Sequence, residues 1–190
     1  MKIIQAQLNK ECIISHYLNK NVLNDFFPYS AKYISKDGFL TKHFEHKTLF
    51  EWEAYIYSQI SKIAPDLYDL SHQEMTYDLS NLSSIRDVLR ENEYNFEKLC
   101  NDLFLFIESF KKYSFIHGNL KIDNIFIDEN DNFYVIDFTH SSIHSNIHSN
   151  IFNQYNDFYS LYNSILNVVN KDQVDYLDNI FNKYVPKMGY

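Results

Sequence analysis

The chain has 190 residues, of which 45% are hydrophobic and 17% are aromatic, and its formal net charge is −8. This length suits one domain or a compact two-lobed unit, and the apolar content is enough for a hydrophobic core. The negative charge excludes a general nucleic-acid-coating role, which requires a basic surface. Cys12 and Cys100 form no metal-binding or redox motif, so a reducing, intracellular compartment is expected.

The sequence contains no segment typical of a membrane protein. No stretch approaches the roughly 20 apolar residues of a membrane span, and the first residues lack an apolar run of signal-peptide length. We therefore expect a soluble, cytoplasmic protein with no membrane partner.

The first half of the chain combines strand patterns with one helical pattern. Asp37-Gly38 lies between two alternating apolar runs, which predicts a β-hairpin. Thr48–Ile63 has apolar residues at helical spacing, and Thr48 and Glu51 have the spacing of a capping box. The predicted strands are Glu11–Leu18, Ala31–Ser35, Phe39–Phe44, Leu67–Leu70 and Glu74–Leu79.

The second half is mostly helical in pattern. Two further strands, Asn124–Asp128 and Phe133–Asp137, flank a polar turn. The predicted helices are Ser83–Leu89, Asn95–Tyr113, Ile151–Val169 and Val174–Tyr184. Strands with one helix followed by mostly helices indicate an α+β fold with two unlike halves, divided at about residue 82.

A tandem repeat of Ile-His-Ser-Asn occupies residues 143–146 and 147–150. It places His140, His144 and His148 at four-residue steps, which on a helix would bring them onto one face and could bind a metal. Because the repeat is of low complexity, a flexible loop accounts for it better than a built site.

Polar side chains gather at the ends of apolar strands in the segment from Phe115 to Thr139. They are His117, Asn119, Lys121, Asn124 and Asp137. An asparagine and an aspartate at strand ends supply oxygen ligands suited to a hard cation such as Mg²⁺, which usually keeps waters and phosphates as its other ligands. The spacing indicates a magnesium–nucleotide site.

The stretch from His117 to Asn124 resembles the protein-kinase catalytic loop, whose pattern is H-R-D-L-x-x-x-N. The stretch from Val135 to Thr139 resembles the strand and the D-F-G element that follow it. The resemblance covers roughly residues 30–170. It implies a two-lobed protein-kinase-like fold, with a small N-terminal sheet lobe at about residues 1–82 and a reduced helical C-terminal lobe at about residues 83–190.

The resemblance assigns roles in and near this loop. Asn119 takes the position of the catalytic base, and Lys121 has the form found in serine/threonine kinases. His117 would give structural support, and Asn124 and Asp137 would be the metal ligands. Asp157 resembles the helix aspartate that braces the catalytic loop.

The same resemblance implies an ATP-binding set upstream. Lys42 fits the strand lysine that holds the phosphates, and Glu53 fits the helix glutamate that pairs with it, with Glu51 as the alternative partner. Met75 and Tyr77 lie on the expected hinge strand beside adenine. ATP and Mg²⁺ are the implied cofactors, and a protein substrate or protein partner is the implied macromolecular contact.

Three departures from the kinase pattern bear on activity. Asn119 replaces the catalytic aspartate, and its amide cannot usefully accept a proton; Asp123 is a nearby carboxylate, but adjacent side chains need not point the same way. Thr139 replaces the glycine of D-F-G. No glycine-rich loop exists, because the three glycines are Gly38, Gly118 and Gly189.

Three functions are therefore compatible with the sequence. One is a divergent serine/threonine-kinase-like protein that binds Mg-ATP, with weak or absent phosphoryl transfer. Another is a pseudokinase that uses this fold as a scaffold for a protein partner without nucleotide. A third is a small-molecule phosphotransferase, suggested by the glycine that follows His117.

Overall fold

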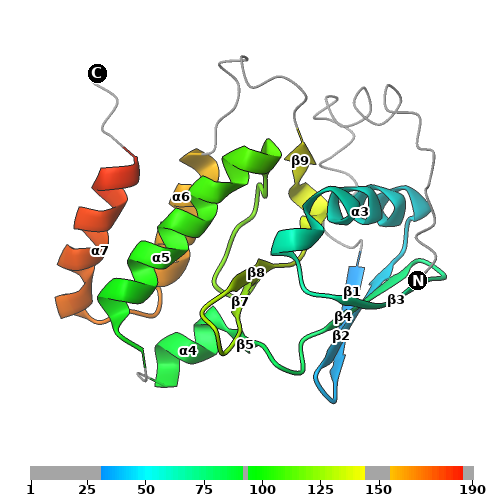
Figure 1. Cartoon of the computed structure of the whole chain (residues 1–190), viewed down its shortest axis with the longest axis horizontal. Coiled ribbons are helices and arrows are strands. Elements are labelled where there is room, and N and C mark those ends of the chain that lie inside the picture. Colours follow the sequence, from blue (N-terminus) through cyan, green and yellow to red (C-terminus); the bar gives the residue numbers. More distant parts are fainter. Residues whose placement is uncertain (1–30, 92–93, 144–154, 186–190) are drawn as a thin grey trace. The chain divides into compact units, whose positions relative to one another are not determined.

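The computed structural model describes residues 31–91, 94–143 and 155–185 (Figure 1). The predicted strand Glu11–Leu18, and His144 and His148 of the tandem repeat, lie outside the described residues. The chain divides into two compact units. We call residues up to 61 together with 65–80 the sheet unit, and residues 62–64 together with those from 81 onward the helical unit.

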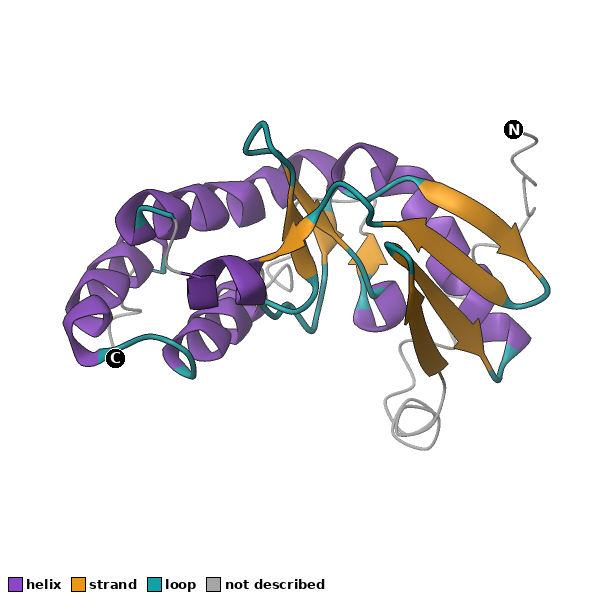
Figure 2. Cartoon of the chain, turned by 90° about the horizontal axis from the view of Figure 1, so that it is seen from below, coloured by secondary structure: helices purple, strands orange, loops and turns teal. Residues whose placement is uncertain are grey.

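The sheet unit is a four-stranded antiparallel sheet with one helix. The strand order is β1-β2-β4-β3 (Figure 2). The strands are β1 (Ala31–Lys36), β2 (Phe39–Phe44), β3 (Leu67–Ser71) and β4 (Glu74–Asp78), and the helix is α3 (Lys47–Ile60). The predicted hairpin is confirmed: Asp37 and Gly38 both have positive φ, 52° and 81°, the combination of a type I′ turn.

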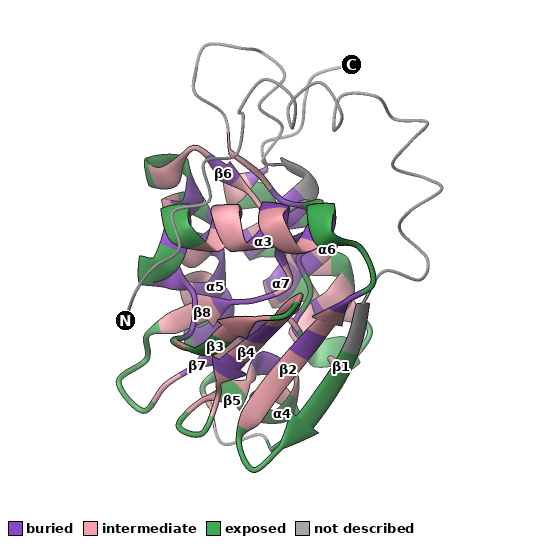
Figure 3. Cartoon of the chain, turned by 90° about the vertical axis from the view of Figure 1, so that its right-hand side faces the viewer, coloured by how far each residue is buried: buried purple, intermediate pink, exposed green. Residues whose placement is uncertain are grey.

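Helix α3 covers one face of this sheet (Figure 1). Its apolar stripe consists of Leu49, Trp52, Ile56 and Ile60, all buried. Every second residue of β2 and β4 is more deeply buried, because successive side chains on a strand point to opposite faces of the sheet. Figure 3 shows the result: β1 is largely exposed, whereas β2 and β4 carry buried positions.

The start of α3 differs from the prediction. The helix begins at Lys47 after His46, whose side chain makes no capping bond. The predicted capping box of Thr48 and Glu51 is therefore wrong. Glu51 lies one turn inside the helix and pairs with Lys47, 3.2 Å away at the i,i+4 spacing.

The helical unit holds two small sheets and four helices among its described residues. The sheet strands are β5 (Ser83–Ser84), β7 (Ile125–Ile127) and β8 (Phe133–Val135) in one sheet, and β6 (Phe115–Ile116) and β9 (Ser142–Ile143) in the other. The helices are α4 (Ile85–Glu91), α5 (Phe96–Ser109), α6 (Tyr155–Leu166) and α7 (Lys171–Tyr184), with short 3₁₀ turns η1 (Ser61–Ile63), η2 (Phe110–Tyr113) and η3 (Phe138–His140). Helices α5, α6 and α7 pack together (Figure 2).

Polar caps set the ends of two of these helices. Asn95 accepts the amide of Lys98 at 3.0 Å and starts α5. Asn170 and Gln173 form a reciprocal capping box at the start of α7. The predicted helix Asn95–Tyr113 is present, but its last turn tightens to η2 and ends at Ser114 in the left-handed conformation.

Aromatic rings fill much of the core of the helical unit. Phe104 stacks on Phe158 with ring centroids 5.7 Å apart. Phe110 contacts Phe115 at 5.1 Å, and Phe115 contacts Phe138 at 6.1 Å. These rings are fully or almost fully buried, so the aromatic richness of the sequence serves packing.

The fold is thus mixed α/β, with a small antiparallel sheet and several helices. Within the described ranges, no helix combines the length and the apolar character that crossing a bilayer requires.

Gly38 offers a test of the hairpin. A Cβ at this position would lie 2.8 Å from Cα of Ser80, and the φ of 81° disfavours any other side chain. We expect Gly38→Ala to lower the free energy of unfolding by at least about 1–2 kcal/mol, the cost of a left-handed residue, measured by urea denaturation. Asp37→Asn is the matched control, because asparagine tolerates the left-handed region; equal stability of Gly38→Ala and wild type would contradict the turn.

Candidate functional site

Lys42 and Glu53 form a buried ion pair in the sheet unit. Nζ of Lys42 lies 2.6 Å from Oε2 of Glu53, and the two side chains are 1% and 0% exposed. Lys42 lies on the strand β2 and Glu53 on α3, which covers that face of the sheet. The structure thus selects Glu53 over Glu51 as the partner of the lysine.

Aromatic rings surround this ion pair. Nζ of Lys42 lies 5.4 Å from the ring centroid of Tyr33 and 5.0 Å from that of Phe44, distances at which a ring face attracts a cation. The Tyr77 hydroxyl donates to Oε1 of Glu53 at 3.4 Å. Tyr77 and Met75 are both fully buried on β4. The structure therefore gives Tyr77 a contact with the ion pair, and a contact of either residue with adenine stays a prediction.

In the helical unit, the buried carboxylate of Asp157 anchors the loop that starts at His117. Its two oxygens accept the backbone N–H groups of His117 and Gly118, each at 2.8 Å. Asp157 is fully buried in α6, and burial raises its pKa above the ordinary value, against the opposing effects of His117 and of the two N–H donors. The predicted brace between Asp157 and this loop is confirmed.

His117 connects this loop to the strand segment before Asp137. Its Nε2 donates to the carbonyl of Ile136 at 2.9 Å, and its Nδ1 accepts the amide of Asn119 at 3.3 Å. Both ring nitrogens are thus used in hydrogen bonds, which fix the orientation of the imidazole. The ring is fully buried, consistent with the supporting role expected for it.

Asn124 and Asp137 lie at neighbouring ends of the β7–β8 pair. Asn124 immediately precedes β7, its carbonyl accepts the amide of Ile136 at 3.0 Å, and Asp137 is the next residue. The Asn124 side-chain amide donates to the carbonyl of Asn119 at 3.2 Å, so its nitrogen is turned toward the loop. Hydrogen bonds therefore connect His117, the backbone of Asn119, Asn124 and the backbone of Ile136, and Asp137 follows Ile136 in the chain.

Two neighbouring residues do not join this network through their side chains. Lys121 is exposed, and only its carbonyl has a bond here, accepting the amide of Asn124 at 2.9 Å. Asp123 is held by the guanidinium of Arg86 from α4 through two hydrogen bonds, of which Nη2 to Oδ2 measures 2.7 Å. The Arg86 bond lowers the pKa of Asp123, which makes its carboxylate a poorer base.

Gly118 is explained by close packing. Its φ is 79°, and a Cβ built there would lie 2.4 Å from the carbonyl oxygen of His140. No side chain fits in that space. Gly118 is therefore accounted for by this contact, without reference to small-molecule phosphotransferases.

Sequence reasoning missed Arg86, Ser141 and Ser164. Ser141 donates to the carbonyl of His117 at 3.0 Å, and Ser164 accepts the amide of Ile122 at 3.1 Å. Ser164 lies seven residues after Asp157 on α6, and this helical spacing was a usable signal. Arg86 had none, because 37 residues separate it from Asp123.

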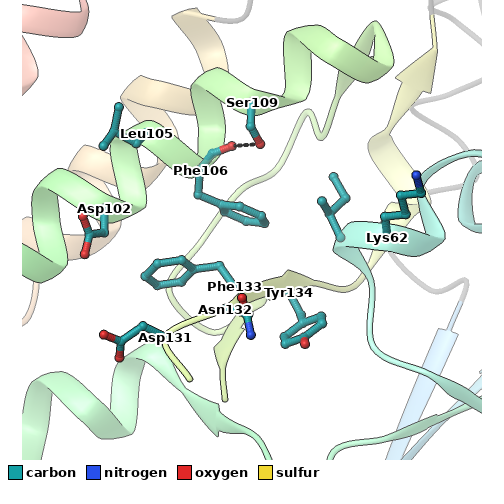
Figure 4. A pocket seen from close by; sticks show the side chains of 10 residues that line it. Lys62, Asp102, Leu105, Phe106, Ser109, Asp131, Asn132, Phe133 and Tyr134 are labelled. Atoms are coloured by element: carbon teal, nitrogen blue, oxygen red, sulfur yellow. Dashed lines mark hydrogen bonds between the residues drawn. The ribbon is translucent and has the colours of Figure 1, made fainter. Parts of the chain in front are cut away.

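A separate open pocket of about 480 Å³ lies beside α5 and β8 in the helical unit (Figure 4). Its lining includes the rings of Phe106 and Phe133, which point into it, but none of the predicted site residues. Its two carboxylates share one lysine: Lys98 lies 2.7 Å from Asp131 and 3.2 Å from Asp102. Both carboxylates on its rim are thus paired within the chain.

Comparison with known proteins supports the fold and leaves the chemistry open. No protein-family model matches the sequence, and no curated protein matches it. Among solved structures, one similar chain is described as a divergent kinase lacking the glycine-rich loop, which regulates membrane ultrastructure of the Toxoplasma parasitophorous vacuole. It aligns with a TM-score of 0.55 and 12% identity, over 96% of this chain and 86% of that one.

At this identity the likeness concerns the fold alone. The chain is kinase-like in fold, as its catalytic-loop motif predicted.

The Asp157 brace can be tested by unfolding. Asp157→Ala leaves two N–H groups without their acceptor, and each unsatisfied buried group costs about 1–3 kcal/mol. For two such groups we expect the free energy of unfolding to fall by about 2–6 kcal/mol in urea denaturation. Asp175→Ala, which removes an exposed carboxylate from α7, serves as the control and should change little; a similarly small effect at Asp157 would refute the brace.

Proposed function

We propose that this chain is a divergent kinase-like protein that binds Mg-ATP and transfers phosphate to serine or threonine hydroxyls weakly or not at all. The buried Lys42–Glu53 pair carries the proposal. Removing two charges from water has a large desolvation cost, and hydrophobic replacements of such pairs are often equally stable. A buried pair of this kind is more readily explained by a function that needs a held cation than by stability.

The residues present fit the implied ligands. Lys42 would contact the phosphates, held in place by Glu53. Asn124 and Asp137 offer amide and carboxylate oxygens, the donors that Mg²⁺ takes together with phosphates and water. Bound magnesium would neutralise charge on the phosphates, which is the main electrostatic requirement of phosphoryl transfer.

Asn119 is the reason to expect slow transfer or none. Its amide can orient a hydroxyl but cannot take up the proton, and loss of a general base costs about 10²–10⁴-fold in rate. Asp123 is no substitute, because Arg86 holds its carboxylate. Residual transfer through positioning and charge neutralisation alone remains compatible with this arrangement.

The absence of a glycine-rich loop does not argue against nucleotide binding. The similar solved protein also lacks this loop and is described as a kinase. The second candidate function is a scaffold that binds a protein partner without nucleotide, and Asn119 is the observation that favours it. Nucleotide binding separates the two functions.

A thermal-shift experiment tests nucleotide binding. We expect Mg-ATP to raise the Tm of wild type, because a ligand present at 100 times its Kd stabilises the native state by about 2.7 kcal/mol. Lys42→Met alone should unfold more easily, because it leaves Glu53 charged and unpaired. The double variant Lys42→Met/Glu53→Gln should regain stability but show no shift with Mg-ATP.

The control is the exposed pair on neighbouring strands, His43 and Glu74, which are 2.8 Å apart. His43→Gln/Glu74→Gln should keep the wild-type shift. An unchanged shift in the Lys42/Glu53 double variant would remove Lys42 from the nucleotide site. No shift in any protein would favour the scaffold.

The base position is tested by restoring the carboxylate. We expect Asn119→Asp to raise γ-phosphate transfer by up to about 10²–10⁴-fold, measured with radiolabelled ATP on the protein itself or a generic substrate. Asp137→Ala in that background should abolish the gain by removing a metal ligand. Asn163→Asp adds the same charge at an exposed position of α6 and should have no effect. Strong wild-type transfer that survives Asn119→Ala would place the base elsewhere.

A further inference from the structure

Thr139 stands where the kinase pattern has a glycine, yet its backbone does not need one. The described non-glycine residues with positive φ do not include Thr139. The left-handed residue in this segment is Asp137, with φ 66° and ψ 70°. The backbone bend that precedes η3 is therefore made at the aspartate, and position 139 is open to a side chain with a task of its own.

The Thr139 hydroxyl bonds the carboxylate of Asp137. Oγ1 donates to Oδ1 of Asp137 at 2.9 Å, and Thr139 is only 8% exposed. Hydrogen bonds to an ionised acceptor are stronger than neutral ones. A β-branched side chain also has few χ1 states, so the direction of this hydroxyl is well defined.

The backbone around Thr139 is fixed to the loop that starts at His117. The carbonyl of His140 lies against Gly118 so closely that no Cβ fits between them. Ser141 donates to the carbonyl of His117 at 3.0 Å, and β9 pairs with β6 directly afterward. These contacts hold the backbone next to Thr139 in place, so its hydroxyl can in turn hold the side chain of Asp137.

We propose that Thr139 is a positioning residue that orients the Asp137 carboxylate for a divalent cation. The inference rests on the proposed function. It adds Thr139, at which this chain differs from the kinase pattern, to the residues of the metal site. A carboxylate oxygen has two lone pairs, so Oδ1 can accept the threonine hydroxyl and still face a cation. A threonine at the position of the D-F-G glycine would therefore support a metal site instead of disabling it.

The experiment is a titration with Mn²⁺ in the presence of a saturating non-hydrolysable ATP analogue. The Tm of the protein is measured at each Mn²⁺ concentration. Thr139→Val keeps the shape and removes the hydroxyl, so we expect half-saturation to need about 10-fold more Mn²⁺, a loss of about 1.4 kcal/mol. Thr139→Ser keeps the hydroxyl and should titrate like wild type. Binding of the analogue in EDTA should be the same in all three proteins, because the hydroxyl acts only through the cation ligand.

The matched control is Thr76→Val, which removes a hydroxyl that shares a 3.0 Å bond with Thr41 in the sheet unit. It should leave the Mn²⁺ dependence unchanged. If Thr139→Val does not fold, Thr139→Gly also removes the hydroxyl and should show the same 10-fold weakening. Wild-type Mn²⁺ dependence in the variant that lacks the hydroxyl overturns the role of Thr139 alone. Failure of wild type to bind the analogue with any cation overturns the proposed function and this role together.

Discussion

The candidate site depends on the side chain of Asp157, which accepts hydrogen bonds from two backbone N–H groups. A buried carboxylate with two donors fixes the direction of the chain at His117 and Gly118. His117 then fixes Ile136, and the chain continues into Asp137. Each further contact of the network relies on the previous one, so one side chain on α6 sets the course of two segments that are distant in sequence.

The two charged centres are built in opposite ways. Lys42 and Glu53 are almost fully buried beside aromatic rings, where their attraction is strong and the cost of losing either partner is high. Arg86 and Asp123 lie nearer the surface, where solvent weakens the pair and its main effect is to turn the carboxylate toward α4. Burial thus distinguishes a strongly coupled ion pair inside the sheet unit from a solvent-exposed pair that restrains a loop.

Local patterns predicted most of the described strands and helices, because hairpin turns and amphipathic helices are encoded over a few residues. Helical spacing also contains a signal that favours Glu53 over Glu51 as the partner of Lys42. Glu53 falls on the buried face of α3, together with Leu49, Trp52, Ile56 and Ile60. The predicted capping box at Thr48 is wrong because the N-cap position is taken by His46, two residues earlier in the chain. Contacts such as Arg86 with Asp123 required the tertiary fold, since no local signal connects residues so far apart.

The close approach of His140 to Gly118 limits how this loop can evolve. Any residue larger than glycine at position 118 would require η3 to move away from the loop. An arginine at this position, as in the common kinase pattern, would therefore need coordinated changes in two segments. Position 119 carries no such restriction: asparagine and aspartate have nearly the same shape, and their codons differ by one base. Packing therefore restricts which residues position 118 can accept, whereas an exchange of asparagine for aspartate at position 119 changes charge with little change in shape.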